Sequence, residues 1–200
     1  MRGLVCGVAG MAGALFLGAC TSPMNLALME PPDPGSRSVS RAGGKVVSIG
    51  FLSIEDLRPE FSKQSIGLVQ GRAVKGPDVL PWIGRALGGL GGTRFSATPA
   101  AGPGGWTVKP ALRQFYAGSL TVSKTVNVVL ELEIRPPTGG TVTRVYRGSI
   151  TAVDWWNTSG EIEQSFHEAF SGCLRQMAAD LDLLVETASG PNEAAHTKDN

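Results

Sequence analysis

The chain has 200 residues, with 18 Lys and Arg against 17 Asp and Glu. This near-neutral balance argues against a nucleic-acid-binding protein, which carries a clear excess of positive charge. The length suffices for one domain with its own hydrophobic core, together with loosely ordered ends.

The first nineteen residues have the layout of a secretory signal: Arg2 gives a positive start, and residues 3–17 are an uncharged, largely apolar run. The run ends in an aliphatic residue, two small residues and a cysteine, namely Leu17, Gly18, Ala19 and Cys20. This order resembles the lipobox of bacterial lipoproteins, in which the cysteine receives a diacylglycerol. We therefore expect residues 1–19 to be a signal peptide and Cys20 to anchor the protein to a membrane through its acyl chains.

The alternatives are an ordinary secretory cleavage and an uncleaved transmembrane helix. Many glycines and the lack of a cationic flank after Cys20 disfavour the helix. With Cys6 removed and Cys20 acylated, Cys173 stands alone, so we expect no disulfide framework.

Residues 20–44 are rich in Pro, Gly and Ser, which predicts a lipidated cysteine followed by a flexible tether. We expect the folded domain to cover residues 45–187. Residues 188–200 lack apolar periodicity, which predicts a disordered tail.

Apolar residues alternate with mostly polar ones over 126–135, and similar patterns cover 106–122 and 142–153. Shorter strands are expected at 45–54 and 65–74. Pro110 places the 106–122 strand at an edge or a bend. The loop 136–140 is rich in Pro and Gly, as expected for a hairpin.

Two helices are predicted. Over 159–187, apolar residues recur every three or four positions, and Thr158 and Glu161 fit a capping box. The other helix covers 78–90 and ends in a run of glycines. Together the elements predict an α+β fold: a two-layer sandwich with a mainly antiparallel sheet of about five strands and two helices on one face.

Charge is unevenly distributed, because residues 37–153 contain 15 basic and 6 acidic side chains whereas residues 154–200 contain 2 and 9. One explanation is internal, with an acidic helix complementing a basic sheet. The other is a cationic surface for anionic lipid, cell-wall polymer or an acidic envelope protein. Its candidate residues lie on neighbouring strands: Arg113, Lys124, Arg135, Arg144 and Arg147.

Trp155 and Trp156 form a second candidate contact site, because adjacent residues on a strand point to opposite faces. One indole would then be exposed, as tryptophan is at many interfaces. If the strand has already ended there, both can pack against the last helix.

The chain resembles the YajG-type envelope lipoproteins in the order of its motifs. They are Ile54-Glu55-Asp56-Leu57-Arg58-Pro59, then Ser65-Ile66-Gly67, then the helix around Trp82 to Leu90, and then the long strands and Trp155. More distantly, the chain is similar to auxiliary lipoproteins of ABC-type transporters. The resemblance covers residues 45–186 and implies a binding or assembly factor without catalytic residues.

Residues suited to catalysis or metal binding are sparse. His196 lies in the expected tail, His167 has no clustered partner, and no Gly-x-Ser-x-Gly elbow is present. We therefore expect a non-enzymatic lipoprotein without cofactor or metal, and as an alternative an auxiliary subunit of an ABC-type lipid or solute transporter. Under the usual sorting rule of the bacterial lipoproteins that the chain resembles, Thr21 in place of Asp implies the periplasmic face of the outer membrane and not the inner membrane.

Overall fold

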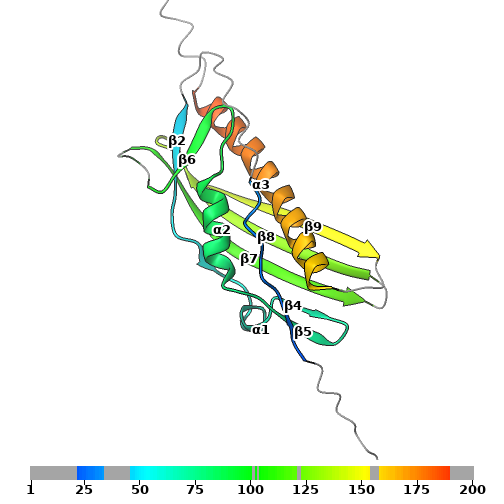
Figure 1. Ribbon diagram of the computed structural model, residues 1–200. Helices are drawn as coiled ribbons and strands as arrows, with labels where there is room; N and C mark the ends of the chain where they lie inside the picture. Colours follow the sequence, from blue (N-terminus) through cyan, green and yellow to red (C-terminus); the bar gives the residue numbers. More distant parts are fainter. Residues whose placement is uncertain are drawn as a thin grey trace, which may run out of the picture.

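The computed structural model describes residues 22–33, 46–100, 102, 104–120, 123–153 and 158–189. A long, twisted sheet carries two helices on one face (Figure 1). In chain order the elements are β1 (Met24–Asn25), β2 (Val47–Phe51), β3 (Glu55–Asp56), α1 (Glu60–Gln64), β4 (Gly67–Val69), β5 (Arg72–Lys75), α2 (Val79–Gly88), β6 (Phe95–Thr98), β7 (Trp106–Leu120), β8 (Ser123–Arg135), β9 (Val142–Val153) and α3 (Ser159–Ser189).

The three long strands β7, β8 and β9 form an antiparallel meander. Their side chains alternate between the two faces of the sheet, so one face collects the apolar residues that the sequence pattern indicated. Val128 and Leu130 of β8, for example, are fully buried on the helix side. The three predicted long strands are therefore confirmed, with β9 at the bounds that we expected.

The other edge of β7 pairs in turn with three short strands, β2, β3 and β4, all parallel to it. The carbonyls of Val108 and Leu112 accept hydrogen bonds from the amides of Leu52 and Leu57 across this edge, both at 2.9 Å. The backbone nitrogen of Pro110, midway between Val108 and Leu112, points to the same edge of β7. At this position β2 has ended and β3 has not begun. The missing N–H of Pro110 is therefore not needed, which explains how a proline fits inside a central strand.

The two longer helices, α2 and α3, begin at side-chain caps. The Asp78 carboxylate accepts a hydrogen bond from the amide of Leu80 at 3.1 Å. At the start of α3, Thr158 and Glu161 form the predicted capping box, with reciprocal bonds of 3.3 and 3.2 Å. No helix among the described residues has the length and hydropathy that crossing a bilayer requires.

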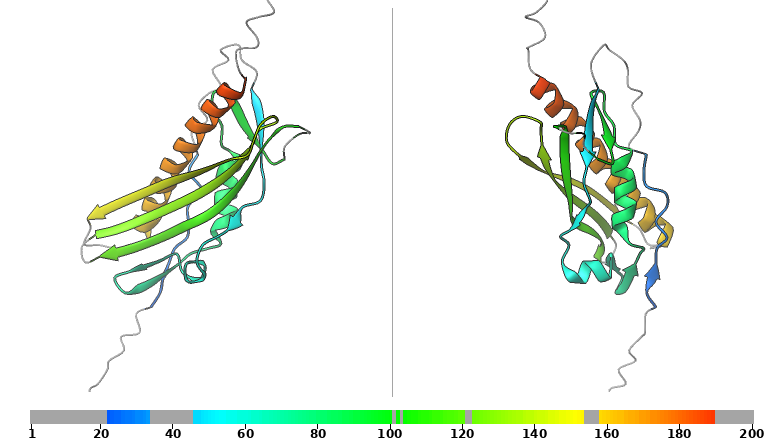
Figure 2. Two further views of the ribbon diagram at one scale, coloured as in Figure 1. Left: turned by 180° about the vertical axis from the view of Figure 1, so that it is seen from behind. Right: turned by 90° about the vertical axis from the view of Figure 1, so that its left-hand side faces the viewer.

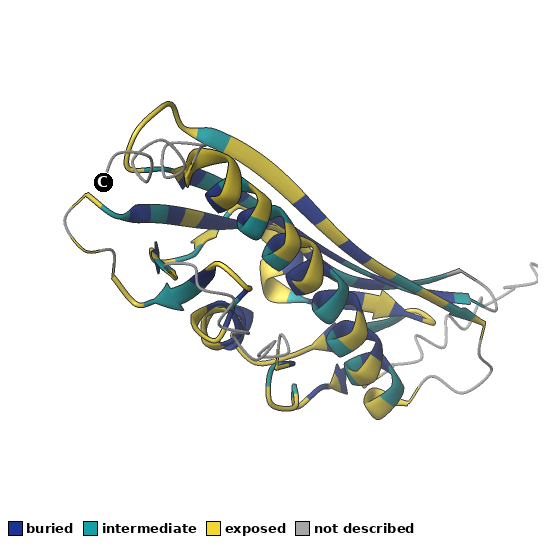
Figure 3. Cartoon of the chain, turned by 90° about the horizontal axis from the view of Figure 1, so that it is seen from above, coloured by how far each residue is buried: buried dark blue, intermediate teal, exposed yellow. Residues whose placement is uncertain are grey.

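The core lies between the helices and the sheet, and its centre is aromatic. The rings of Phe115 on β7 and Phe166 on α3 stack at 4.2 Å, and Trp82 on α2 packs against Phe115 and Phe170. Figure 3 shows the resulting pattern on α3, with buried residues toward the sheet and exposed ones away from it.

The fold is richer than the predicted two-layer sandwich. The described residues form a sheet of nine strands, not five, and three helices, and five of the eight strand pairings are parallel. The short strands have two to five residues, too few for alternation to be visible. The expected strand 65–74 is instead a hairpin of β4 and β5, which turns through Gln70 and Gly71 at φ of 49° and 72°.

The expected flexible tether is in part folded. Residues 22–33, which we call the entry strap, lie against the domain, with Met24 and Leu26 only 7% and 6% exposed. Burial of Met24 and Leu26 stabilises the segment against the domain, an effect that its proline-rich composition did not indicate. At the other end, α3 continues through Ser189, so the first two residues of the expected tail are helical.

Candidate binding surface

The face of the β7–β8–β9 meander that points away from α2 and α3 is left uncovered over much of its area, and we call it the open face. The left view of Figure 2 shows the three strands from this side, with α3 behind them. Its side chains belong to the strand positions that alternate with the core. Cross-strand pairing places Gln114, Val129 and Arg147 in one row and Tyr116 and Asn127 in the next.

A hollow of about 520 Å³ lies where the short helix α1 approaches the open face. Its lining is Pro59, Phe61, Ser62, Arg113, Gln114, Tyr116, Val129 and Arg147. Phe61 remains 65% exposed although its ring makes an edge contact with Tyr116 at 6.2 Å. The volume of the hollow lies within the range of ligand pockets, and the exposed ring of Phe61 provides apolar contact surface at its wall.

A charged turn positions α1. Asp56 and Arg58 form a bidentate ion pair with distances of 2.9 and 2.8 Å, and Arg58 also donates to the carbonyl of Ser62 at 3.1 Å. Arg58 is buried, and the carboxylate of Asp56 compensates the positive charge that burial would otherwise leave unpaired. The hydrogen bonds from Arg58 lower the pKa of the Asp56 carboxyl below its ordinary value. The Asp-x-Arg-Pro sequence thus has a structural role at the wall of the hollow.

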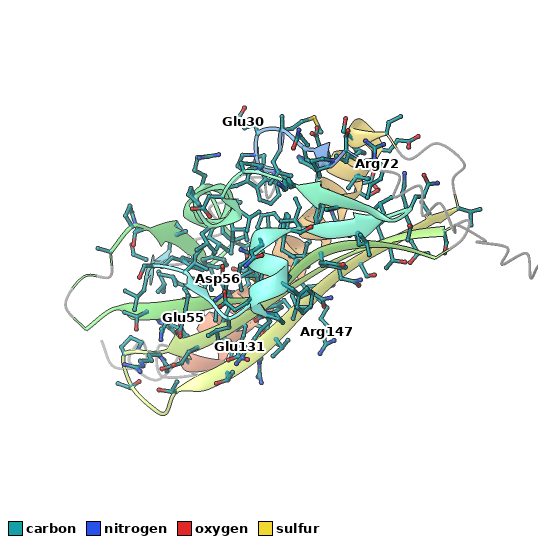
Figure 4. All side chains as sticks on the ribbon, turned by 90° about the horizontal axis from the view of Figure 1, so that it is seen from below. Glu30, Glu55, Asp56, Arg72, Glu131 and Arg147 are labelled. Atoms are coloured by element: carbon teal, nitrogen blue, oxygen red, sulfur yellow. The ribbon has the colours of Figure 1, made fainter. Side chains whose placement is uncertain are left out.

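Arg147 differs from the other cations near the hollow. Arg113 makes a bidentate pair with Glu131 at 3.0 and 3.1 Å, and Lys109 pairs with Glu55 at 2.7 Å. The exposed guanidinium group of Arg147 has no such partner among the described residues. Figure 4 shows Arg147 and Glu131 on the same face of the sheet, beside α1. The hollow therefore combines apolar walls with one available positive charge.

The five cations proposed as one surface are not brought together. Arg113, Arg135 and Arg147 lie on the open face, whereas Lys124 and Arg144 lie on the helix side. Arg135 is paired with Glu133, and Lys124, 5% exposed at its side chain, is paired with Glu161. Alternation of side chains along each strand separates the set. Within the part of the chain that the structure describes, Arg147 is the only one of the five without an ion-pair partner.

The acidic helix complements the basic sheet region directly. Among the described residues, three ion pairs join α3 to the rest of the domain: Lys124–Glu161 at 3.2 Å, Arg94–Glu186 at 2.9 Å and Arg144–Asp180 at 3.4 Å. Asp180 also accepts a hydrogen bond from Tyr146 at 2.6 Å. The uneven charge along the sequence is thus partly an internal match between α3 and the sheet.

Several candidate residues lie outside the described part of the chain: Leu17, Gly18, Ala19, Cys20, Trp155 and Trp156. Cys173 is a free thiol in the core, as the helical pattern indicated, and burial raises its pKa to about 12. Within the described residues, no three His, Cys, Asp or Glu side chains gather in a way that could hold a metal ion.

Most of the hollow was not predicted. Phe61 was not singled out, because α1 is too short for a periodic pattern. Gln114 and Tyr116 were not singled out as site residues, because the irregularity in β7 between Leu112 and Gln114 changes which residues face outward. Two signals were present in the sequence. Val129 is an apolar residue on the otherwise polar side of its strand, and Phe61 is an aromatic residue between charged and polar neighbours.

No protein-family model matches the chain, and no curated protein matches it. Solved structures share its fold at very low identity. Protein XCC0632 from Xanthomonas campestris, assigned to the family DUF330, is 9% identical with a TM-score of 0.53, over 83% of this chain and 98% of that one. An uncharacterized protein is 7% identical with a TM-score of 0.50, over 80% and 99% of the two chains. These likenesses concern the fold alone, and the resemblance to YajG-type lipoproteins stays a prediction.

Proposed function

We propose that this protein is a non-enzymatic lipoprotein of the cell envelope, anchored through Cys20 to the periplasmic face of the outer membrane, that binds a protein partner through its open face. The hollow beside α1 carries this proposal, because it joins exposed apolar side chains to Arg147, which has no ion-pair partner among the residues that the structure describes. The lipobox of residues 17–20 supports the anchor.

The chemistry of the hollow indicates the contact that a partner would make. Phe61 and Tyr116 offer aromatic surface, and Val129 forms a buried apolar floor at 8% exposure. Arg147 favours a carboxylate beside the group that fills the hollow, since desolvated charge pairs fix orientation in an interface. A partner segment with an apolar side chain next to Asp or Glu meets both requirements.

Photocrosslinking in intact cells tests the binding site. We expect a photoreactive amino acid at Phe61 to give a discrete crosslinked product that Arg147→Glu abolishes. Leu183 on α3 is 56% exposed and supplies the matched control position, where we expect no such product. Equal products at both positions, or none at Phe61, would contradict binding at the open face.

The anchor is tested separately. Intact mass of the mature protein should show the acyl chains, and Cys20→Ala should remove them and release the protein from membranes. Acylation that persists in Cys20→Ala would refute the lipobox assignment. Fractionation of the two membranes tests the outer-membrane location.

The alternative function, an auxiliary subunit of an ABC-type transporter, calls for a ligand other than a protein. The mostly apolar lining of the hollow also fits a segment of an acyl chain. Lipid that remains with the detergent-free domain in native mass spectra, and is lost in Phe61→Ser, would favour this alternative over a protein partner.

A further inference from the structure

The entry strap determines where the chain enters the domain. The Ser22 carbonyl accepts a hydrogen bond from Arg72 at 3.0 Å, at the hairpin of β4 and β5. Two residues later, Met24 and Asn25 pair with Val74 and Lys75 as strand β1. Ser22, which already contacts the domain, is only two positions after Cys20 in the sequence.

The strap is held along its length by hydrogen bonds as well as by burial. The Leu26 amide donates to the backbone carbonyl of Lys75 at 2.8 Å, and the Ala27 amide donates to the Glu163 carboxylate at 2.6 Å. Further on, the Trp82 indole donates to the Met29 carbonyl at 2.7 Å. Because Met24 and Leu26 are also buried, detaching the strap would expose apolar surface and break several bonds.

Two residues of extended chain span only about 7 Å. Building on the proposed acylation of Cys20, we infer that the short connection holds one end of the domain against the bilayer. This end, which we call the anchor end, is where Ser22 meets the β4–β5 hairpin and where β7 ends and β8 begins. The partner that this surface contacts is the layer of lipid headgroups.

Contacts across the sheet define the anchor end. The backbone amide of Gln70, at the hairpin turn, donates to the hydroxyl oxygen of Ser119 on β7 at 2.7 Å. Leu120 pairs with Ser123 at the start of β8, and Ser123 pairs with Val153 at the end of β9. Near this end Leu68 and Val153 are 50% and 74% exposed. Apolar side chains so exposed suit contact with a bilayer interface.

The same geometry fixes the direction of the long strands. β9 has 12 residues, and a strand of that length extends roughly 36 Å away from the anchor end. The hairpin between β8 and β9 therefore points away from the membrane. The hollow beside α1 lies between the two ends and stays accessible from the periplasm.

Fluorescence quenching in vesicles tests this orientation. The acylated protein is reconstituted in vesicles of phosphatidylethanolamine and phosphatidylglycerol that contain a lipid with a nitroxide headgroup. A single cysteine at Leu68→Cys or Thr143→Cys carries the fluorophore. Cys20 is blocked by acylation and Cys173 is buried, so the new thiol reacts alone. We expect several-fold stronger quenching at position 68 than at position 143, because the two exposed positions lie near opposite ends of the sheet.

Two further variants test whether the short connection to Cys20, and not an affinity of the anchor end for lipid, holds the domain against the bilayer. A long Gly-Ser linker inserted between Thr21 and Ser22 leaves the domain unchanged, and it should reduce quenching at position 68 to the level at position 143. Leu26→Asn should have a similar effect by loosening the strap. Strong quenching that survives the linker would overturn the inference.

Intact mass measured on the same samples distinguishes the two ways of failing. Equal quenching at positions 68 and 143 in protein with acyl chains would refute the orientation alone. Mature protein without acyl chains would refute the proposed anchor, and the orientation with it.

Discussion

At the scale of single residues, glycine sets how closely α3 approaches the sheet. A Cβ at Gly148 of β9 would overlap the carbonyl oxygen of Ala169 on α3. Since that atom belongs to the helix backbone, it cannot move aside as a flexible side chain would. The close approach is what lets Phe166 and Phe170 reach the core on either side of Ala169.

Gly148→Ala should therefore lower the free energy of unfolding by about 3 kcal/mol, because helix and sheet must separate. Urea unfolding followed by circular dichroism measures the change. Gly172→Ala on the same helix is the matched control, since a Cβ there meets only the tip of Arg175. It should be neutral or stabilise by up to about 1 kcal/mol. Equal effects of the two substitutions would refute the close-contact argument.

Asp182 on α3 organises the turn before β6. Its carboxylate accepts three hydrogen bonds, from the amide and hydroxyl of Thr93 at 2.8 and 3.0 Å and from the amide of Arg94 at 2.9 Å. Asp182→Ala should cost about 1–2 kcal/mol by leaving two backbone donors without their acceptor. Amide hydrogen exchange at Thr93 and Arg94 should accelerate. Asp182→Asn keeps one acceptor oxygen and should cost less; unchanged exchange in both variants would contradict this role.

The ion pair of Asp56 and Arg58 predicts a pH dependence. Because Arg58 lowers the pKa of Asp56 from its ordinary 3.8, the pair stabilises the fold above that pH. The contribution is lost as pH falls below 3.8 through the lower pKa of the folded state. Wild type should exceed Asp56→Asn in unfolding free energy by about 1–2 kcal/mol near neutral pH. A gap that stays constant down to about pH 2.5 would rule out Asp56 as the titrating group.

At the scale of elements, sequence pattern was reliable where elements are long. The alternation over residues 126–135 and the spacing over 159–187 each predicted an element and its buried face. The short strands beside β7 were only partly visible, because β3 and β4 have two and three residues and depend on pairing with β7. Parallel pairing joins segments distant in sequence, which local pattern does not encode.

The candidate site was less predictable than the fold for the same reason. Arg147 was among the predicted residues, but its neighbours in the hollow come from α1 and from an irregularity in β7 between Leu112 and Gln114. That irregularity changes which residues share the open face beyond it. A count of alternating positions along β7 cannot place Arg113 and Tyr116 without it.

The entry strap, which its composition predicted to be a flexible tether, should contribute to the stability of the domain. Protein that begins at Val46 should be less stable than protein that begins at Ser22 by about 3–5 kcal/mol, the value for burying Met24 and Leu26. Thermal unfolding of the two forms measures this difference. Equal stability would show that the strap contributes nothing to the fold and would weaken the inferred orientation.

At the scale of the whole molecule, the two faces of the sheet have different roles. The helix side contains the aromatic core and the ion pairs of α3, so changes there affect stability. The open face contributes little to the core, since Phe61 and Arg147 are both exposed. Binding and stability should therefore be separable by substitution.

The double substitution Phe61→Ser with Arg147→Glu tests this separation. With a photoreactive amino acid at Gln114, which also lines the hollow, the otherwise unchanged protein should give a crosslinked product. The double substitution removes the exposed ring and reverses the charge at position 147, so it should abolish that product. The free energy of unfolding should stay within about 0.5 kcal/mol of wild type, because neither side chain is buried. Phe115→Ser on the core side should do the opposite and destabilise the domain strongly, since Phe115 is fully buried. A large loss of stability in the double variant would mean that Phe61 and Arg147 serve to stabilise the fold, and it would contradict the proposal that the hollow is a binding site.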